Sequence, residues 1–404
     1  MKLSEELKWR GFINQTTYDD ISVLNDEPIS FYIGVDPSSD SMTIGNLAAI
    51  MMVKCFIKHG HKAFLLVGGA TGMIGDPDGK FDERNLKTVD EINKNKEAIA
   101  SQYRIILDGD NFSLVDNYDW FKDINYLDFL RNIGKHVPMS QMLGRDFVQS
   151  RLGSEGSGIS YAEFSYSLIQ GYDFLHLFRE FGVTLQLCGA DQWGNSITGV
   201  DLIRRIESKE AHVYSTPLII NKSTGAKFGK SEDGAIWLDH NKTSTYKFFQ
   251  FWLNADDAGV IDYLKVYTLL EKEKIDELDK ELKNNPEARL AQKMLAREVT
   301  TLIHGKERTE SVEKVTNVLF GGEKFESLSE ADIEILSKEI PADITGKSVV
   351  EYLVLSNIAL GNNDARRLIS AGAVSINGQK ITEDRIINER ALVKKGKNSF
   401  VLVR

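Results

Sequence analysis

Two glycine-interrupted loops carry the basic residues that are best suited by type and spacing to do chemistry. They are GDPDGKFDERNL (75–86), with Lys80 and Arg84, and KSTGAKFGKSEDG (222–234), with Lys222, Lys227 and Lys230. Glycine lets a backbone approach a ligand closely, and the cationic side chains could hold a polyphosphate. Neither loop matches the Walker A pattern, so phosphate binding and ordinary solvated loops both stay open.

A second candidate site is the start of an apolar helix at Gly45 and Asn46. The run Ile29–Val35 predicts a strand, 45–59 a helix and 63–67 a second strand. Such a βαβ unit has parallel strands and a right-handed crossover. Free N–H groups at the helix start favour an anion such as a phosphate, although many such units bind nothing.

A third candidate is the predicted helix 161–181, where Tyr166, Gln170 and Asp173 share one face at spacings i, i+4 and i+7. Periodicity alone favours a solvent-facing stripe over a pocket wall. The apolar run Val183–Leu187 predicts a strand, and the polar block CGADQWGN (188–195) follows it. Residues just past a strand's carboxyl end belong to the ligand crevice of an open α/β sheet.

Length, composition and charge describe an ordinary globular protein of two or three domains. The chain has 404 residues, 42% of them hydrophobic, and a net charge of −10. Residues 347–404 hold ten basic and five acidic residues, so a basic C-terminal module follows an acidic body. That asymmetry suggests an anionic macromolecular partner for the module alone.

Cysteine usage and the N-terminal sequence bear on metal binding and location. Cys55 and Cys188 fit no zinc or redox spacing, and Cys55, among apolar neighbours, is expected to be buried. No apolar run approaches the length of a membrane span, and MKLSEELKWRG does not resemble a signal peptide. We expect a cytoplasmic protein.

The remaining segments are predicted mainly from their periodicity. Residues 1–28 and 87–150 are expected to be largely helical, Pro217–Ile220 a strand, and 243–321 helical around Pro286. A polar stretch at about 321–346 separates these from a C-terminal segment that mixes helices with short strands. Asn377–Gly378 predicts a hairpin turn there.

Six blocks in a fixed order resemble bacterial tyrosyl-tRNA synthetase, a class I aminoacyl-tRNA synthetase, almost end to end. They are FYIGVDPSSDS, LVGGATGMIGDPDGK, EFSYSLIQGYDF, GADQWGN, KFGKSEDGAIWLD and the S4-like ending ARRLISAGAVSINGQK. The resemblance implies an α/β fold: a Rossmann-like parallel-sheet catalytic domain, an α-helical domain and a small α+β S4-like RNA-binding domain. The implied ranges are 1–220 catalytic (115–185 a connecting insertion), 221–245 the KFGKS loop region, 246–322 helical, 323–346 a linker and 347–404 S4-like.

The sequence departs from the family at its first signature. Where the family has HIGH, this chain has TIGN, residues 43–46. Thr43 replaces an imidazole thought to stabilise the transferring phosphates, and we expect its hydroxyl to donate one hydrogen bond to a phosphate oxygen, with Ser38 adding another. The substitution bears on the rate at which tyrosine would be activated by ATP more than on whether the chain has that function.

The implied reaction joins tyrosine to ATP, releases pyrophosphate, and transfers tyrosine to the 3′-terminal adenosine of tRNA(Tyr). The nucleophile is already a carboxylate, so catalysis is positioning plus stabilisation of charge on the phosphates. Mg²⁺ accompanies the ATP phosphates, with no dedicated protein metal site. The residues expected to act on the phosphates are Thr43, Asn46, Lys80, Arg84, Lys227 and Lys230, while Lys222 is a bystander.

Recognition of both substrates also follows from the resemblance. Tyr32 and Asp173 are expected to bond the phenolic hydroxyl of tyrosine, which both donates and accepts. The other tyrosine-binding residues would be Asp76, Tyr166, Gln170 and Gln192. The ATP or adenylate would contact Asp36, Ser38, Gly45, Asp191 and Lys230.

The tRNA and a second subunit are the macromolecular partners that the resemblance implies. The expected phosphate contacts are Arg366, Arg367, Lys394, Lys395 and Lys397. Arg204 and Arg205 would meet the acceptor arm, or equally form a solvated helix face. The family is a homodimer, with residues 115–185 at the interface.

Two alternatives remain. One is a synthetase-derived RNA-binding protein in which TIGN has abolished activation, although the named pocket residues are intact. The other is tryptophan activation on the same fold. An indole offers only an N–H donor, so Tyr32 with Asp173 suits it less well than a phenol.

Overall fold

The computed structural model describes residues 1–77, 87–107, 109, 111–144, 146–152, 158–226, 228–231 and 234–404. The chain forms two compact units. Unit 1 comprises Met1–Thr243 and Asn254–Leu295, and unit 2 comprises Ser244–Leu253 and Ala296–Arg404. Among the described residues, no helix combines the length and the apolar character needed to cross a membrane.

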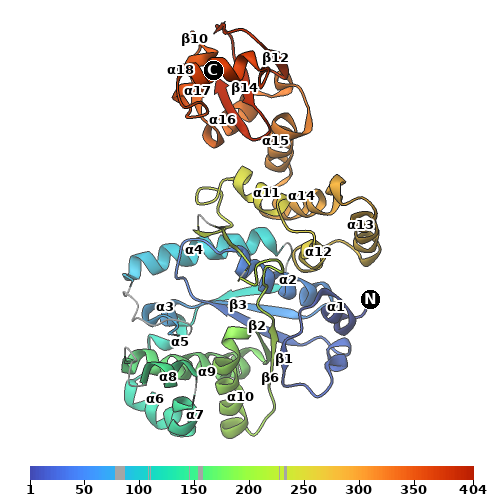
Figure 1. Ribbon diagram of the computed structural model, residues 1–404. Helices are drawn as coiled ribbons and strands as arrows, with labels where there is room; N and C mark the ends of the chain where they lie inside the picture. The colour runs from blue at the N-terminus through green and yellow to red at the C-terminus, as the bar shows by residue number, and fades with distance from the viewer. Residues whose placement is uncertain are drawn as a thin grey trace. The chain divides into compact units, whose positions relative to one another are not determined.

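Unit 1 is built on a six-stranded sheet in the order β1-β6-β5-β2-β3-β4 (Figure 1). Only the short edge strand β1 is antiparallel; the other five strands are parallel. The chain runs outward from β2 through β3 to β4, then returns to β5 on the other side of β2 and continues to β6. The strand order thus reverses between β2 and β5, which is where open α/β sheets form their ligand crevice. The strands are β1 Gln15–Thr16, β2 Ser30–Val35, β3 Lys62–Val67, β4 Phe112–Val115, β5 Val183–Gly189 and β6 His212–Thr216.

Helices cover both faces of this sheet because its strands alternate their apolar side chains. Phe31 of β2 packs on Phe56 of helix α2 (Ile44–Lys58), with ring centroids 5.1 Å apart. Its neighbour Tyr32 points to the opposite face and packs on Phe174 of helix α9 (Tyr161–Phe181), at 5.2 Å. Figure 1 shows α2 on one side of the sheet and α9 with α10 (Trp193–Glu207) on the other.

Helix α9 has the bounds that the sequence predicts because both of its ends are capped locally. Ser160 and Glu163 form a capping box, with the Glu163 N–H donating to the Ser160 hydroxyl at 3.3 Å. Gly182 ends the helix in the left-handed conformation at φ 64°. The helix therefore presents a fixed face to the crevice.

The rest of unit 1 is helical around the sheet. Its other described helices are α1 Leu3–Arg10, α3 Gly69–Ile74, α4 Val89–Ile106, α5 Tyr118–Phe121, α6 Tyr126–Asn132, α7 Met139–Leu143, α8 Asp146–Leu152, α12 Val260–Tyr267 and α13 Lys272–Asn284. A two-stranded ribbon, β7 Lys230–Ser231 with β8 Gly234–Ala235, follows the lysine loop.

Unit 2 combines helices with a five-stranded sheet in the order β12-β11-β14-β15-β9. Asn377 and Gly378 both have positive φ between β11 and β12, which confirms the predicted hairpin turn. The helices are α11 Thr245–Leu253, α15 Lys306–Thr316, α16 Glu330–Glu339, α17 Val349–Leu355 and α18 Asn362–Ser370, and α14 Leu290–His304 divides between the units. The strands are β9 Ala342–Asp343, β10 Lys347–Ser348, β11 Val374–Ile376, β12 Gln379–Ile381, β13 Ile386–Ile387, β14 Ala391–Lys395 and β15 Ser399–Val403.

Four expectations need correction. The strand predicted at Pro217–Ile220 is β6 instead, which ends at Thr216, because proline has no N–H to continue a ladder. Strand β4 lies inside a segment predicted to be helical. The predicted linker at 323–346 contains α16 and β9, with Phe325, Ile333 and Leu336 buried in a cluster of unit 2. Residues 1–28 are helical only in α1 and the short turn Ile21–Asn25.

Candidate active site

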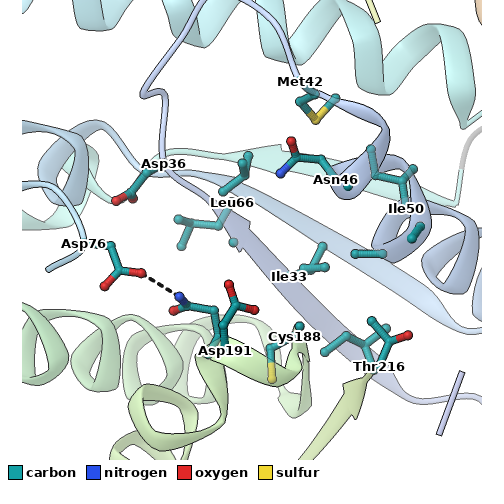
Figure 2. A pocket seen from close by; sticks show the side chains of 18 of the residues that line it. Ile33, Asp36, Met42, Asn46, Ile50, Leu66, Asp76, Cys188, Asp191 and Thr216 are labelled. Atoms are coloured by element: carbon teal, nitrogen blue, oxygen red, sulfur yellow. Dashed lines mark hydrogen bonds between the residues drawn. The ribbon is translucent and has the colours of Figure 1, made fainter. Parts of the chain in front are cut away.

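A cavity of about 340 Å³ opens in unit 1 where the strand order reverses. The carboxyl ends of β2, β5 and β6, the start of α2 and one face of α9 line it. Figure 2 shows Ile33 of β2 with Asp36 just after that strand, and Cys188 of β5 with Asp191 just after it, on the cavity walls. The crossover of the sheet therefore assembles the site from segments that lie far apart in the sequence, from Tyr32 to Phe228.

Tyr32 and Asp173 form the deeply buried part of the cavity lining, which we call its closed end. Both side chains are 1% exposed, and the hydroxyl of Tyr32 has no hydrogen-bond partner among the described residues. Burial raises the pKa of Tyr32, and the nearby Asp173 carboxylate adds to that effect. A buried hydroxyl without a partner is costly, so this end of the cavity is suited to a ligand that carries a polar group.

The Asp173 carboxylate is itself held by two donors from the segment after β4. Asn117 Nδ2 donates to Oδ2 at 3.1 Å, and Trp120 Nε1 donates to Oδ1 at 2.9 Å. The Trp120 ring stacks on His176 with centroids 4.4 Å apart. Burial raises the pKa of Asp173 to about 8 although both hydrogen bonds favour its charged form. The carboxyl is thus fixed in orientation.

Carboxylates and amides from four segments surround the middle of the cavity. Tyr166 Oη donates to Asp36 Oδ2 at 2.8 Å, and Gln192 Nε2 donates to Asp76 Oδ2 at 2.5 Å, the dashed line of Figure 2. The Oε1 atom of Gln170 is buried without a hydrogen-bond partner among the described residues. Two carboxylates and a spare acceptor can bind an ammonium group. The polar stripe on α9 is thus a pocket wall, and its solvent-facing interpretation is wrong for these residues.

The start of α2 forms another part of the lining. Thr43 is the N-cap, and its backbone N and its Oγ1 both donate to Asn46 Oδ1, at 2.9 and 3.0 Å. A Cβ atom on Gly45 would meet only Thr43 Oγ1, at 3.5 Å, an ordinary contact. The protein itself therefore does not require glycine here, which leaves the space beside it to a ligand. Ser38 lies on the same lining and is exposed.

The predicted phosphate-binding loops are described only in part. Lys80, Arg84 and Lys227 lie outside the described residues. Lys230 begins β7, and the preceding Gly229, at φ 97°, lies so close to Ile44 that an added Cβ would be 2.7 Å from its side chain. The backbone of the second loop is thus brought to the start of α2. Lys222 pairs with Asp262 on α12, and its bystander role stays a prediction.

The predicted tRNA contacts differ in how freely they are presented. Arg366 and Arg367 are exposed on α18, and Lys397 is exposed at the β14–β15 turn. By contrast, Lys394 donates to the Leu319 carbonyl at 2.8 Å and lies over the Phe400 ring, and Lys395 is partly buried. In unit 1, Arg204 pairs with Asp201 and Arg205 donates to the His136 carbonyl, both at the surface.

Sequence reasoning missed Asn117 and Trp120, as well as Gln186, whose buried Oε1 lines the cavity without a partner among the described residues. The contacts of Asn117 and Trp120 with Asp173 on α9 span more than 50 residues, so no local periodic signal in the sequence indicates them. Within the described ranges, no group of three or more His, Cys, Asp or Glu side chains could hold a metal ion. Cys55 and Cys188 are buried free thiols, and burial raises the pKa of each to about 12.

Comparison with known proteins agrees with this fold. Residues 24–321 match the family model of class I tRNA synthetases (W and Y), so the chain belongs to that family. Residues 332–404 match a tyrosine–tRNA ligase SYY-like C-terminal domain. Two relatives that align with the chain over essentially their whole length are tyrosine–tRNA ligases. It is 42% identical to the tyrosine–tRNA ligase of Limosilactobacillus reuteri, with both chains fully covered, and 43% identical to tyrosine–tRNA ligase 2 of Bacillus cereus, covering 100% of this chain and 99% of the relative.

Solved structures give the same result. A C-terminally truncated mitochondrial tyrosyl-tRNA synthetase from Aspergillus nidulans superposes with a TM-score of 0.71 at 29% identity, covering 79% of this chain and 94% of the other. A tryptophanyl-tRNA synthetase from Encephalitozoon cuniculi bound to tryptophan superposes with a TM-score of 0.56 at 14% identity, covering 77% of this chain and 89% of the other. The second likeness concerns the fold alone.

Proposed function

We propose that the cavity binds tyrosine and ATP side by side, so that the chain works as a tyrosine–tRNA ligase. The observation that carries the proposal is the closed end of the cavity, where the unpartnered Tyr32 hydroxyl and the oriented Asp173 carboxylate lie close together. The phenolic hydroxyl of tyrosine can accept a hydrogen bond from Tyr32 and donate one to Asp173. An indole N–H could serve only one of them, and a phenylalanine ring neither.

The tyrosine α-amino group lies among Asp76, Tyr166 and Gln170 in this assignment. The carboxylate of Asp76 and the spare acceptor of Gln170 attract an ammonium group, while the Gln192 amide, which donates to Asp76, fixes that carboxylate. The substrate carboxylate then points toward the nucleotide, which lies near Gly45 and among Asp36, Ser38 and Asp191.

The chemistry is an in-line displacement on the α-phosphorus of ATP. A tyrosine carboxylate oxygen attacks, the bond to the bridging oxygen breaks, and pyrophosphate leaves with its electron pair, giving tyrosyl adenylate. No general base is needed, because the nucleophile is an anion. Asn46 and the loop cations Lys80, Arg84, Lys227 and Lys230 stabilise the charge that develops on the phosphates, with Mg²⁺ carried by the ATP. A ribose hydroxyl at the tRNA 3′ end then takes the tyrosyl group and releases AMP.

Tyrosine-dependent exchange of labelled pyrophosphate into ATP tests this assignment. We expect exchange with tyrosine and background exchange with tryptophan or phenylalanine, followed by charging of tRNA(Tyr). Exchange that depends on tryptophan would assign the site to the other branch of the family. Binding of tRNA without exchange would favour the RNA-binding alternative.

The partners in the second step are tRNA(Tyr) and a second copy of the chain, and we place the enzyme in the cytoplasm. The exposed arginines of α18 and Lys397 suit the tRNA backbone, each contributing a salt-sensitive contact. Within 115–185, several large apolar side chains are about half exposed or more, which suits a subunit interface: Tyr126, Leu127, Met139, Leu152 and Tyr161. Size-exclusion chromatography with light scattering should give a dimer, and Leu127→Glu should shift it toward monomer.

A further inference from the structure

The amide of Asn46 has only one possible orientation in this structure. The backbone N–H of Thr43 lies 2.9 Å from the Asn46 side chain and can only donate, so the amide atom that it meets must be the oxygen, Oδ1. The amide nitrogen, Nδ2, therefore points the other way. Among the described residues, nothing accepts a hydrogen bond from it.

The same logic assigns the proton of the Thr43 hydroxyl. Its Oγ1 lies 3.0 Å from Asn46 Oδ1, which is an acceptor only, so the hydroxyl must donate. A hydroxyl has one proton, and this one is already used. Thr43 consequently has no donor left for a phosphate oxygen, which differs from the expectation drawn from the sequence.

The backbone of Thr43 is anchored from both sides. Thr43 forms an isolated antiparallel bridge with Trp237, and the next N–H, of Ile44, donates to the Ile236 carbonyl at 3.1 Å. On the other side, the Met42 N–H donates to Gln102 Oε1 at 2.8 Å. The two donors that meet Asn46 thus start from a fixed position.

Asn46 Nδ2 points toward Leu66, another residue of the cavity lining. Asn46 is half-buried on the lining, and Figure 2 shows its nitrogen on the side of Leu66 and its oxygen on the side of Met42. At this point Gly45 leaves the helix start open to a ligand. A fixed N–H donor here can meet an oxygen of the nucleotide.

We propose that Thr43 is a positioning residue: its N–H and hydroxyl hold the Asn46 amide so that Nδ2 donates to an oxygen of bound ATP. Thr43 does not itself contact the phosphates. The inference rests on the proposed function, since it concerns the ATP subsite of that same cavity. It also explains how threonine serves at this position in TIGN, because its role is to hold a neighbouring donor.

A double-mutant cycle tests the proposal, read from pyrophosphate exchange and from equilibrium binding of ATP alone. Thr43→Val removes the hydroxyl and keeps the side-chain shape, and we expect kcat/KM for ATP to fall about three- to tenfold, the size of one lost neutral hydrogen bond. The KM for tyrosine should not change. Thr43→Ser should restore most of the loss. In an Asn46→Ala background, Thr43→Val should have no further effect, because there is no amide left to position.

Asn46→Asp separates the cap from the donor. Aspartate still accepts both hydrogen bonds from Thr43 and suits a helix start, so the melting temperature should be unchanged or higher. Exchange should nevertheless fall at least about tenfold, because an acceptor replaces Nδ2. Ser348→Ala is the matched control: Ser348 caps α17 with the same box, its N–H donating to Glu351 at 2.7 Å in unit 2, and exchange should be unaffected.

Two results with the variants would overturn the inference, and so would a native protein that binds no ATP. Multiplicative losses in the double variant would mean that Thr43 contacts the nucleotide directly, and native-like exchange by Asn46→Asp would mean that Nδ2 is not used. Native protein that binds ATP but shows no tyrosine-dependent exchange would defeat the proposed function, while the cycle in ATP affinity would still decide the role of Thr43. Native protein that binds no ATP would defeat both.

Discussion

Replacing Tyr32 by phenylalanine changes a single atom at the closed end of the cavity and gives three measurable effects of different sign. The hydroxyl is buried and has no partner within the described residues. Its removal should therefore leave the melting temperature unchanged or slightly raised, because a buried unpaired hydroxyl is unfavourable in the free protein.

The effects on the two amino acids can be estimated from the hydrogen bonds involved. Tyrosine loses one neutral donor, worth about 0.5–1.5 kcal/mol, so its kcat/KM should fall by roughly two- to twelvefold. The kcat/KM for phenylalanine should rise in the variant. In the native protein, bound phenylalanine leaves the Tyr32 hydroxyl without water or a partner, at a penalty of about 1–3 kcal/mol, and the variant lacks that hydroxyl. Together these terms lower the preference for tyrosine by at least about tenfold.

Pyrophosphate exchange with tyrosine and with phenylalanine measures that preference directly. Tyr214→Phe is the matched control, since Tyr214 is also fully buried with an unpartnered hydroxyl but packs on Phe56 away from the cavity lining. We expect this control to keep the native preference. A Tyr32→Phe preference within about twofold of the native value, or an equal loss in the control, would refute the reasoning, because one hydrogen bond is worth more than that.

Three further predictions concern charge. Burial raises the pKa of Asp173 from 3.8 to about 8, so the folded protein binds the extra proton between these values and its stability falls as the pH rises through that window. Asp173→Asn removes this dependence. Between pH 5 and 8, the melting temperature of the variant minus that of the native protein should increase by about 2 °C or more per pH unit. A difference that does not change with pH would contradict the assignment. Arg151→Met strips the buried Glu163 carboxylate of its bidentate partner at 2.8 and 3.0 Å and should destabilise unit 1 by about 3–5 kcal/mol in urea. Burial raises the pKa of Glu163 but the Arg151 hydrogen bond lowers it below 4.5, so the loss should be full above that pH and shrink below it; a constant loss would count against the pairing. Lys394→Ala should lower the melting temperature of unit 2, because Lys394 is bonded to the Leu319 carbonyl, whereas Arg366→Ala should leave it unchanged and weaken tRNA binding; the reverse pattern would overturn both roles.

The sequence alone was sufficient where structure depends on neighbours in the chain. The βαβ unit, the bounds of α9 and the Asn377–Gly378 turn were all predicted, because capping boxes, left-handed glycines and hydrophobic periods act within a few residues. Local composition gave a wrong prediction where a polar segment also carries apolar side chains that become buried in the folded protein. The polar composition of 323–346 predicted a linker, but three apolar side chains on its helix and turn found a core to pack against.

Only the tertiary structure decided which polar side chains act together. The stripe on α9 became a pocket wall because the strand order reverses beside it, and the donors of Asp173 came from a segment more than 50 residues away. The role that we propose for Thr43 depends on a single acceptor: its backbone N–H and its hydroxyl both donate to the same Asn46 oxygen. Residue types limit which hydrogen bonds are possible, but the geometry of the fold determines which donor meets which acceptor, and hence which groups remain for a ligand.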